Sequence, residues 1–174
     1  SYTVRHLGGD YPIATVSETS QYNLKTCTTG NAAPTGYTYR LTLDKLEMVE
    51  IGCDGGFAPT PEVYYSFSVT NDAGTKTVVS LPSTSPVDIG EGGFHTFPHN
   101  QNDYSIYKDG RGTIKINGTA WDQDGGSNDD RIGVWTNLTY GASTSNGQRF
   151  FTREENGCKV RLYLTMTRLG NLYD

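Results

Sequence analysis

The chain has 174 residues, enough for one domain with a buried core. Its net charge of −5 at pH 7 argues against a nucleic-acid partner, because nucleic-acid binding depends on Lys and Arg neutralising phosphates. No apolar run approaches the 18 residues or so of a membrane-spanning helix. The 21 glycines and 12 tyrosines favour strands joined by tight turns over helices.

Residues 1–36 are expected to form an N-terminal arm. They show little periodicity, and Ser, Thr, Gly and Asn crowd residues 17–36, so the one strand that the pattern suggests in the arm lies near Tyr22–Cys27. The sequence starts at Ser1 without Met, as it would after removal of a signal peptide or within a longer protein. We therefore expect a secreted or extracellular protein, or a piece of a larger secreted one.

Alternating apolar residues predict strands from Tyr37 onward. Tyr39, Leu41 and Leu43 alternate with polar residues, and the alternation slips by one position at Leu46, which indicates a bulge. The Pro and Gly residues within 82–103 predict irregular structure there. Further strands are predicted at 63–69, 76–81, 113–121, 132–140 and 159–167. About eight short strands and no helical period predict an all-β, eight-stranded antiparallel β-sandwich over residues 37–174.

An acidic segment follows the strand predicted at 113–121. Four aspartates, Asp122, Asp124, Asp129 and Asp130, fall within nine positions. Such crowding is unfavourable unless the segment is well solvated or a cation neutralises it. Ca²⁺ takes several oxygen ligands in the irregular geometry that a loop provides. The segment is not an EF-hand, because its spacing lacks the required Gly and Glu. A solvated turn and a calcium loop both stay open at this point.

The acidic segment resembles the third calcium-binding loop of C2 domains. The family pattern is Asp-x-Asp, five residues, then Asp-x-Ile-Gly, and this chain has Asp122-Gln-Asp124, five residues, then Asp130-Arg-Ile132-Gly133. Asp129 lies off the pattern, so the resemblance gives it a smaller role. The segments Gly147–Phe151 and Lys159–Thr167 resemble the end of the family's sequence.

The family's first loop has a weaker counterpart here. The strand at 41–51 leads to Asp54-Gly55-Gly56, and Glu62-Val63 stands where the family has Asp-Pro before an alternating strand. The resemblance, over residues 37–170, implies a C2-like fold and a bound Ca²⁺. The metal ligands that it implies are Asp54, Glu62, Asp122, Asp124 and Asp130.

The resemblance also implies a function without catalysis. C2 domains dock to anionic phospholipid surfaces through Ca²⁺, and no catalytic motif such as Gly-x-Ser-x-Gly or HExxH occurs, so we expect no enzyme. Residues 125–128 are polar, and the sequence shows no basic strand. The resemblance therefore supports calcium binding better than lipid binding. Two alternatives remain: a calcium-dependent carbohydrate-binding or adhesive module, with a glycan as partner, and a sandwich with purely structural calcium.

Four other residues are of types that could belong to a site. His95 and His99 are four apart, but Pro98 lies between them, so a metal role is a minor alternative. Trp121 and Trp135 either stack on a sugar or lie in the core, and their places in predicted strands favour the core. The sequence leaves the oligomeric state open, as it does glycosylation of the Asn117 and Asn137 triplets.

Three cysteines, Cys27, Cys53 and Cys158, allow at most one internal disulfide, and their spacing alone does not choose the pair. A C2-like strand order implies that Cys53 lies at the calcium end and Cys158 at the far end. The bond expected from that order is Cys27–Cys158, with Cys53 free or joined to another chain.

Overall fold

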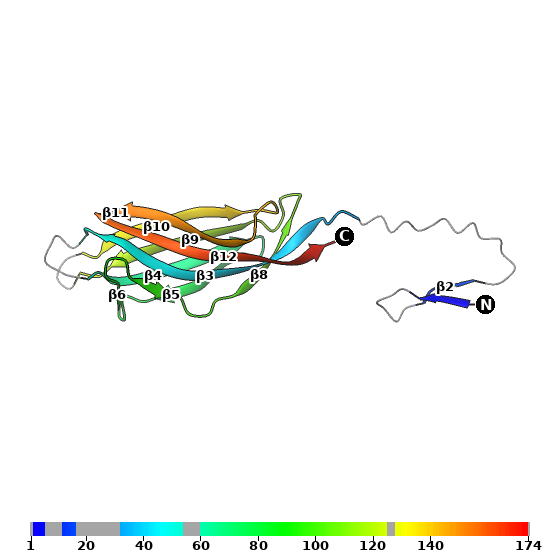
Figure 1. The fold of residues 1–174 in the computed structure, drawn as a ribbon, viewed down its shortest axis with the longest axis horizontal. Helices are drawn as coiled ribbons and strands as arrows, with labels where there is room; N and C mark the ends of the chain where they lie inside the picture. The colour runs from blue at the N-terminus through cyan, green and yellow to red at the C-terminus, as the bar shows by residue number, and fades with distance from the viewer. Residues whose placement is uncertain (1, 6–11, 17–31, 54–59, 125–127, 174) are drawn as a thin grey trace. The chain divides into compact units, whose positions relative to one another are not determined.

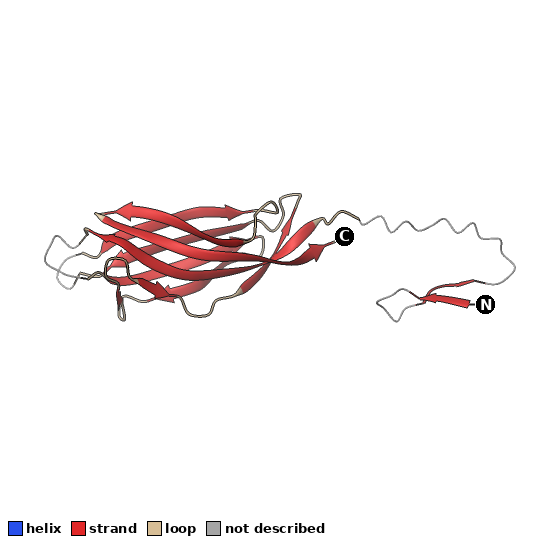
Figure 2. Cartoon of the chain, viewed as in Figure 1, coloured by secondary structure: helices blue, strands red, loops and turns tan. Residues whose placement is uncertain are grey.

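The computed structural model describes residues 2–5, 12–16, 32–53, 60–124 and 128–173 (Figure 1). All regular elements in these ranges are strands (Figure 2), and none of the residues described forms a helix that could cross a membrane. The chain divides into two units, residues 1–32 and residues 33–174.

The first unit contains a short antiparallel hairpin. Its strands are β1 (Tyr2–Arg5) and β2 (Pro12–Val16), with Tyr2 opposite Val16. The strand predicted near Tyr22–Cys27 lies outside the described residues.

The second unit is a sandwich of two antiparallel sheets with five strands each. The first, called the β4 sheet, has the order β10 (Asp130–Tyr140), β9 (Ile114–Asp122), β4 (Glu62–Asn71) and β5 (Gly74–Leu81), with β6 (Val87–Asp88) also paired to β4. The second, called the β3 sheet, has the order β11 (Gly147–Glu155), β12 (Cys158–Leu172), β3 (Gly36–Ile51) and β7 (Phe94–Thr96), with β8 (Asn102–Tyr107) also paired to β3. The predicted all-β sandwich is confirmed.

The sandwich has ten described strands where eight were expected. The segment expected to be irregular contains β6, β7 and the start of β8. β6 and β7 have only two and three residues, too few to show an alternating pattern. The other addition is β11, which pairs along its whole length with β12, from Gly147 opposite Met166 to Glu155 opposite Cys158.

The core lies between the sheets and is built by every second residue of the long strands. In β3 the buried positions pass from Leu41 and Leu43 to Leu46 and Met48, so the predicted bulge is present. Buried Asn100 supports it: its side chain accepts a hydrogen bond from the Leu43 N–H and donates one to the Leu43 carbonyl, both at 2.8 Å. Each apolar side chain buried here stabilises the fold by about 1.5–3 kcal/mol.

A two-residue turn joins β11 to β12. Both of its residues have positive φ, 50° at Asn156 and 87° at Gly157, as the type I′ turn of a tight hairpin requires. The turn also packs against the end of β3, because the Gly52 N–H donates to the Gly157 carbonyl at 3.0 Å. A Cβ on Gly52 would lie 2.5 Å from that carbonyl oxygen, so the approach requires glycine.

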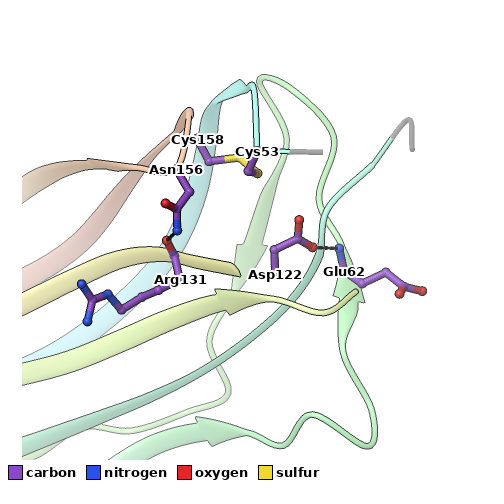
Figure 3. Close-up of a disulfide and its surroundings, with 6 residues drawn as sticks. All are labelled: Cys53, Glu62, Asp122, Arg131, Asn156 and Cys158. Carbon is purple, nitrogen blue, oxygen red and sulfur yellow. Dashed lines mark hydrogen bonds between the residues drawn. A yellow bond between two sulfur atoms is a disulfide. The ribbon is translucent and has the colours of Figure 1, made fainter. Parts of the chain in front are cut away.

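This turn determines which cysteine Cys158 can reach. The predicted Cys27–Cys158 bond is wrong. Cys53 and Cys158 are bonded, with their Cα atoms 4.9 Å apart (Figure 3). In the expected C2-like strand order, the closing strand follows β10 directly. It would then start at the end of the sandwich opposite Cys53. Because β11 intervenes and reverses the direction once more, β12 begins where β3 ends, with Cys158 opposite Ile51.

Loss of this disulfide should destabilise the sandwich. Its cysteines are 105 residues apart, and the chain-entropy argument gives about 4.7 kcal/mol for a loop of roughly 100 residues. We expect the double variant Cys53→Ala/Cys158→Ala to lose several kcal/mol in the free energy of unfolding, measured by urea denaturation. Cys27→Ser is the matched control and should unfold like the wild type. A peptide containing Cys27 bonded to Cys158 in a non-reducing digest would contradict the pairing.

Candidate functional site

Three strand ends of the β4 sheet place acidic residues at one end of the sandwich. β9 ends at Asp122, β10 begins at Asp130 directly opposite it, and β4 begins at Glu62, next to the Val63–Asp122 pair. Asp124 follows β9, and Asp129 precedes β10. We call this region the acidic end and define it by Glu62, Asp122, Asp124, Asp129 and Asp130. The turn and disulfide of the other sheet lie at the same end (Figure 3).

Asp122 is the buried member of the acidic end, with 2% of its surface exposed. Its Oδ1 accepts a hydrogen bond from the Glu62 backbone N–H at 2.8 Å (Figure 3). The Gln123 N–H in turn donates to the Glu62 carbonyl at 2.9 Å. A buried carboxylate is costly without such a donor. The two bonds together attach the end of β9 to the start of β4.

The other predicted ligands are more open. Glu62 is exposed, and its carboxylate points away from Asp122 (Figure 3). Asp124 and Asp130 are half-buried. Within the described part of the chain, the carboxylates of these three residues make no hydrogen bond or ion pair with a protein group. Asp54 lies outside the described residues, although the preceding Cys53 is held at this end by its disulfide.

The basic side chain next to these carboxylates is directed elsewhere. Arg131 follows Asp130 and forms a bidentate ion pair with Glu155 of β11, with both N–O distances at 3.0 Å. The Asn156 side chain donates to the Arg131 carbonyl at 3.0 Å (Figure 3). Arg131 therefore ties the two sheets together and does not pair with the carboxylates of Asp124 and Asp130.

Asp129 makes more contacts than its place outside the C2 pattern predicted. Its Oδ2 accepts a hydrogen bond from the Tyr64 hydroxyl at 2.8 Å, and its Oδ1 accepts one from the Asp124 N–H at 3.3 Å. Burial, followed by this hydrogen bond to a carboxylate, raises the pKa of Tyr64 to about 12. The sequence signal for this contact was weak: Tyr64 stands at an outward position of β4, and 65 residues separate it from Asp129.

The two tryptophans have different surroundings. Trp135 is 1% exposed and lies in the core, where its indole N–H donates to the Phe151 carbonyl at 3.0 Å. Trp121 is half-buried on the outer face of the β4 sheet, so the prediction of a core position is wrong for it. Its ring lies parallel to that of Tyr64 within 8°, with the ring centroids 6.3 Å apart.

The oxygen-rich donor set suits a hard cation such as Ca²⁺ in its chemistry. Among the residues that the structure describes, however, no three His, Cys, Asp or Glu side chains are grouped closely enough to hold a metal. A complete Ca²⁺ shell would therefore need ligands from residues 54–59 or 125–127, backbone carbonyls or water. The minor histidine alternative gains no support either, because neither His95 nor His99 belongs to a group of three potential metal ligands among the described residues. The His95 ring packs against those of Tyr65 and Phe97.

No protein-family model and no curated protein matches the chain. Solved structures similar to it include a C2 domain (TM-score 0.32, 13% identity, 75% of this chain and 98% of that chain). They also include a C2 domain of plant extended synaptotagmin 1 (TM-score 0.34, 9% identity, 80% and 99%). Human GIVD cytosolic phospholipase A2 is similar as well (TM-score 0.41, 10% identity, 78% of this chain), and the chain spans 18% of its length.

C2 domains are thus among the similar solved structures, as the acidic segment predicted. At TM-scores of 0.32 to 0.41 and identities of 9% to 13%, this similarity is too low to infer a shared site. The function is argued below from the chain's own residues.

The Tyr64–Asp129 hydrogen bond should show in the alkaline stability of the protein. The folded state raises the pKa of Tyr64 from 10.0 to about 12, so its contribution to stability is complete below pH 10 and is lost as the pH rises toward 12. We expect the free energy of unfolding to fall over this range, and to fall less in Tyr64→Phe.

A second variant separates the hydrogen bond from burial. Asp129→Asn should lower the pKa of Tyr64, followed by ultraviolet absorbance, while leaving that of Tyr65 raised, because burial alone raises the pKa of Tyr65 to about 12. Identical alkaline titrations of the wild type and Asp129→Asn would contradict the contact.

Proposed function

We propose that the chain is a calcium-binding, C2-like β-sandwich module that binds Ca²⁺ at the acidic end. The proposed ligands are Asp122, Asp124 and Asp130, with two further candidates: Asp54, from the segment after β3, and Glu62, the first residue of β4. The observation that carries the proposal is that Asp122 and Asp130 are directly opposite each other at the adjoining ends of β9 and β10, with Asp124 two residues after Asp122, while the neighbouring Arg131 pairs with Glu155.

The electrostatics of the strand ends support a cation. Asp122 and Asp130 are directly opposite each other in the β9–β10 ladder, and like charges in that position are destabilising. A bound cation would turn this repulsion into attraction. Ca²⁺ fits better than Mg²⁺, because it accepts irregular carboxylate and carbonyl ligands where Mg²⁺ requires a near-octahedral shell. Such a site would bind a metal ion and organise the loop around it. We therefore propose that the chain is not an enzyme.

The disulfide supports a secreted or extracellular location for this module. Disulfides persist in oxidising compartments and are rare where thiols are kept reduced. The Cys53–Cys158 bond joins the end of β3 to the start of β12 beside the acidic end. It would hold this end together when no metal is bound.

Calcium should stabilise the folded chain. A ligand that binds only the folded state adds about 2.7 kcal/mol at a free concentration one hundred times its dissociation constant. For a chain of this size we expect the melting temperature to rise by roughly 5–10 °C in saturating Ca²⁺ and to return to its metal-free value in chelator. Calorimetric titration should show heat of binding.

Charge-neutralising variants locate the site. Asp124→Asn and Asp130→Asn should reduce the shift in melting temperature without lowering the metal-free stability, because these carboxylates make no described hydrogen bond. Asp103→Asn is the matched control: Asp103 is an exposed residue of β8 that pairs with Arg40 at 2.8 Å, and its loss should leave the calcium effect intact. An unchanged melting curve in millimolar Ca²⁺, with no heat of binding, would refute the proposal.

Docking to anionic phospholipid through Ca²⁺ is a separate part of the proposal. The metal-free acidic end should repel an anionic surface, and bound Ca²⁺ should reverse that field. We expect the chain to co-sediment with phosphatidylserine vesicles in Ca²⁺ and to stay in the supernatant with chelator. Asp130→Asn should reduce the bound fraction, and Asp103→Asn should not. Equal sedimentation with Ca²⁺ and with chelator would contradict docking through Ca²⁺ and leave the calcium site as a separate proposal.

A further inference from the structure

The outer face of the β4 sheet carries two adjacent rows of side chains. One row crosses β5, β4 and β9 and consists of Ser80, Ser66 and Thr119, which are direct neighbours in the two ladders. The next row toward the acidic end consists of Tyr64 and Trp121, again directly opposite each other. Successive residues of a strand point to opposite faces, so all five side chains lie on the outer face.

A groove of about 370 Å³ follows these rows. Pro82 and Ser83, which come after β5, complete its rim. Its lining is aromatic, aliphatic and hydroxyl-bearing, and none of the lining side chains is charged. The lack of charge is distinctive on a chain with 33 formally charged Lys, Arg, Asp and Glu side chains, 14 basic and 19 acidic.

The hydroxyl groups of the groove are available to a ligand. Ser66 and Ser80 are exposed, and Ser83 and Thr119 are half-buried. Within the described residues, none of these four hydroxyls makes a hydrogen bond to another protein group. Each can donate one hydrogen bond and accept two.

The aromatic rings of the groove are held in place before any ligand arrives. The Tyr64 hydroxyl donates to Asp129 at 2.8 Å, and the Tyr64 ring lies parallel to that of Trp121 within 8°. Trp121 is half-buried. Rings that are already fixed lose little conformational entropy when a ligand packs on them.

We propose that this groove binds a neutral carbohydrate, with a sugar ring against Trp121 or Tyr64 and its hydroxyls bonded to the serine and threonine row. A sugar ring has an apolar face of C–H groups and an edge of hydroxyls, which matches an aromatic row beside a hydroxyl row. A pocket with apolar walls and a few fixed polar groups is typical of small-ligand sites. An acidic glycan fits less well, because the lining offers no cationic side chain.

The surface beyond the groove favours a chain of sugars over a single sugar. The next rows along β4 and β5 are Ser68 with Thr77 and Thr70 with Thr75, and the two hydroxyls of the latter pair lie 2.8 Å apart. On β4 and β5 these rows continue the hydroxyl surface away from the aromatic pair, and on β9 the residues opposite Ser68 and Thr70 are Asn117 and the exposed Lys115. An oligosaccharide that runs along β4 would therefore meet one aromatic contact followed by successive hydroxyl groups.

The test uses the full chain and a panel of neutral hexasaccharides of glucose, mannose, galactose and xylose, titrated by calorimetry. We expect at least one hexasaccharide to bind, and to bind more tightly than its monosaccharide. Trp121→Ala should weaken that binding by roughly tenfold or more, since an aromatic contact is commonly the main one in such a site. Ser66→Ala should weaken it by a smaller factor.

Phe150→Ala is the matched control, because Phe150 is an aromatic residue of the β3 sheet that is 55% exposed. It should bind as the wild type does. Each variant is also melted with and without Ca²⁺, so a folding defect in Trp121→Ala is recognised, in which case Trp121→Phe replaces it and should bind at intermediate strength. Absence of binding by every hexasaccharide at millimolar concentration would overturn the proposal, as would unchanged binding in the folded Trp121 variant. The calcium proposal would stand in either case, because its melting shift is measured separately.

Discussion

The left-handed turn at Asn156 and Gly157 is the constraint on which the arrangement of this sandwich depends. It returns the chain directly from β11 into β12, so that β12 starts where β3 ends and pairs with it from Cys158–Ile51 to Leu172–Gly36. The same return brings Gly157 against Gly52 and Cys158 within bonding distance of Cys53. The β11–β12 turn therefore decides both the pairing at the centre of the β3 sheet and the location of the disulfide.

The acidic end is a consequence of where strands stop. Antiparallel pairing brings the end of β9 beside the starts of β4 and β10, and each of these termini carries a carboxylate. Part of the resulting charge is accommodated by the protein, through the Glu62 N–H on Asp122 and the Tyr64 hydroxyl on Asp129. Arg131 would be the obvious counter-charge, yet it is held by Glu155 of the other sheet. The remaining negative charge is the basis of the proposed cation site at this end.

The proposed groove and the acidic end are connected through Asp129. Its carboxylate binds the hydroxyl of Tyr64, and Tyr64 lies parallel to Trp121 in the groove. A ligand that reorganises the loop around Asp129 would therefore act on the aromatic pair, and a ligand on the aromatic pair would act on the loop. Coupling of this kind is reciprocal, so each ligand would change the affinity of the other by the same factor.

The sequence by itself determined the fold class, the bulge in β3 and the grouping of the aspartates, because alternation and spacing are local properties of the chain. It also contained the turn, since Asn-Gly between two strands is a strong hairpin signal, but the irregular apolar pattern of β11 concealed its partner strand. Only the tertiary structure decided the disulfide, because one additional strand reverses the end at which Cys158 lies. It also decided that Trp121 faces outward while Trp135 fills the core, and that Asp129 binds Tyr64 across 65 residues of sequence. Pairing between strands far apart in sequence fixes these contacts, and no local pattern encodes that pairing.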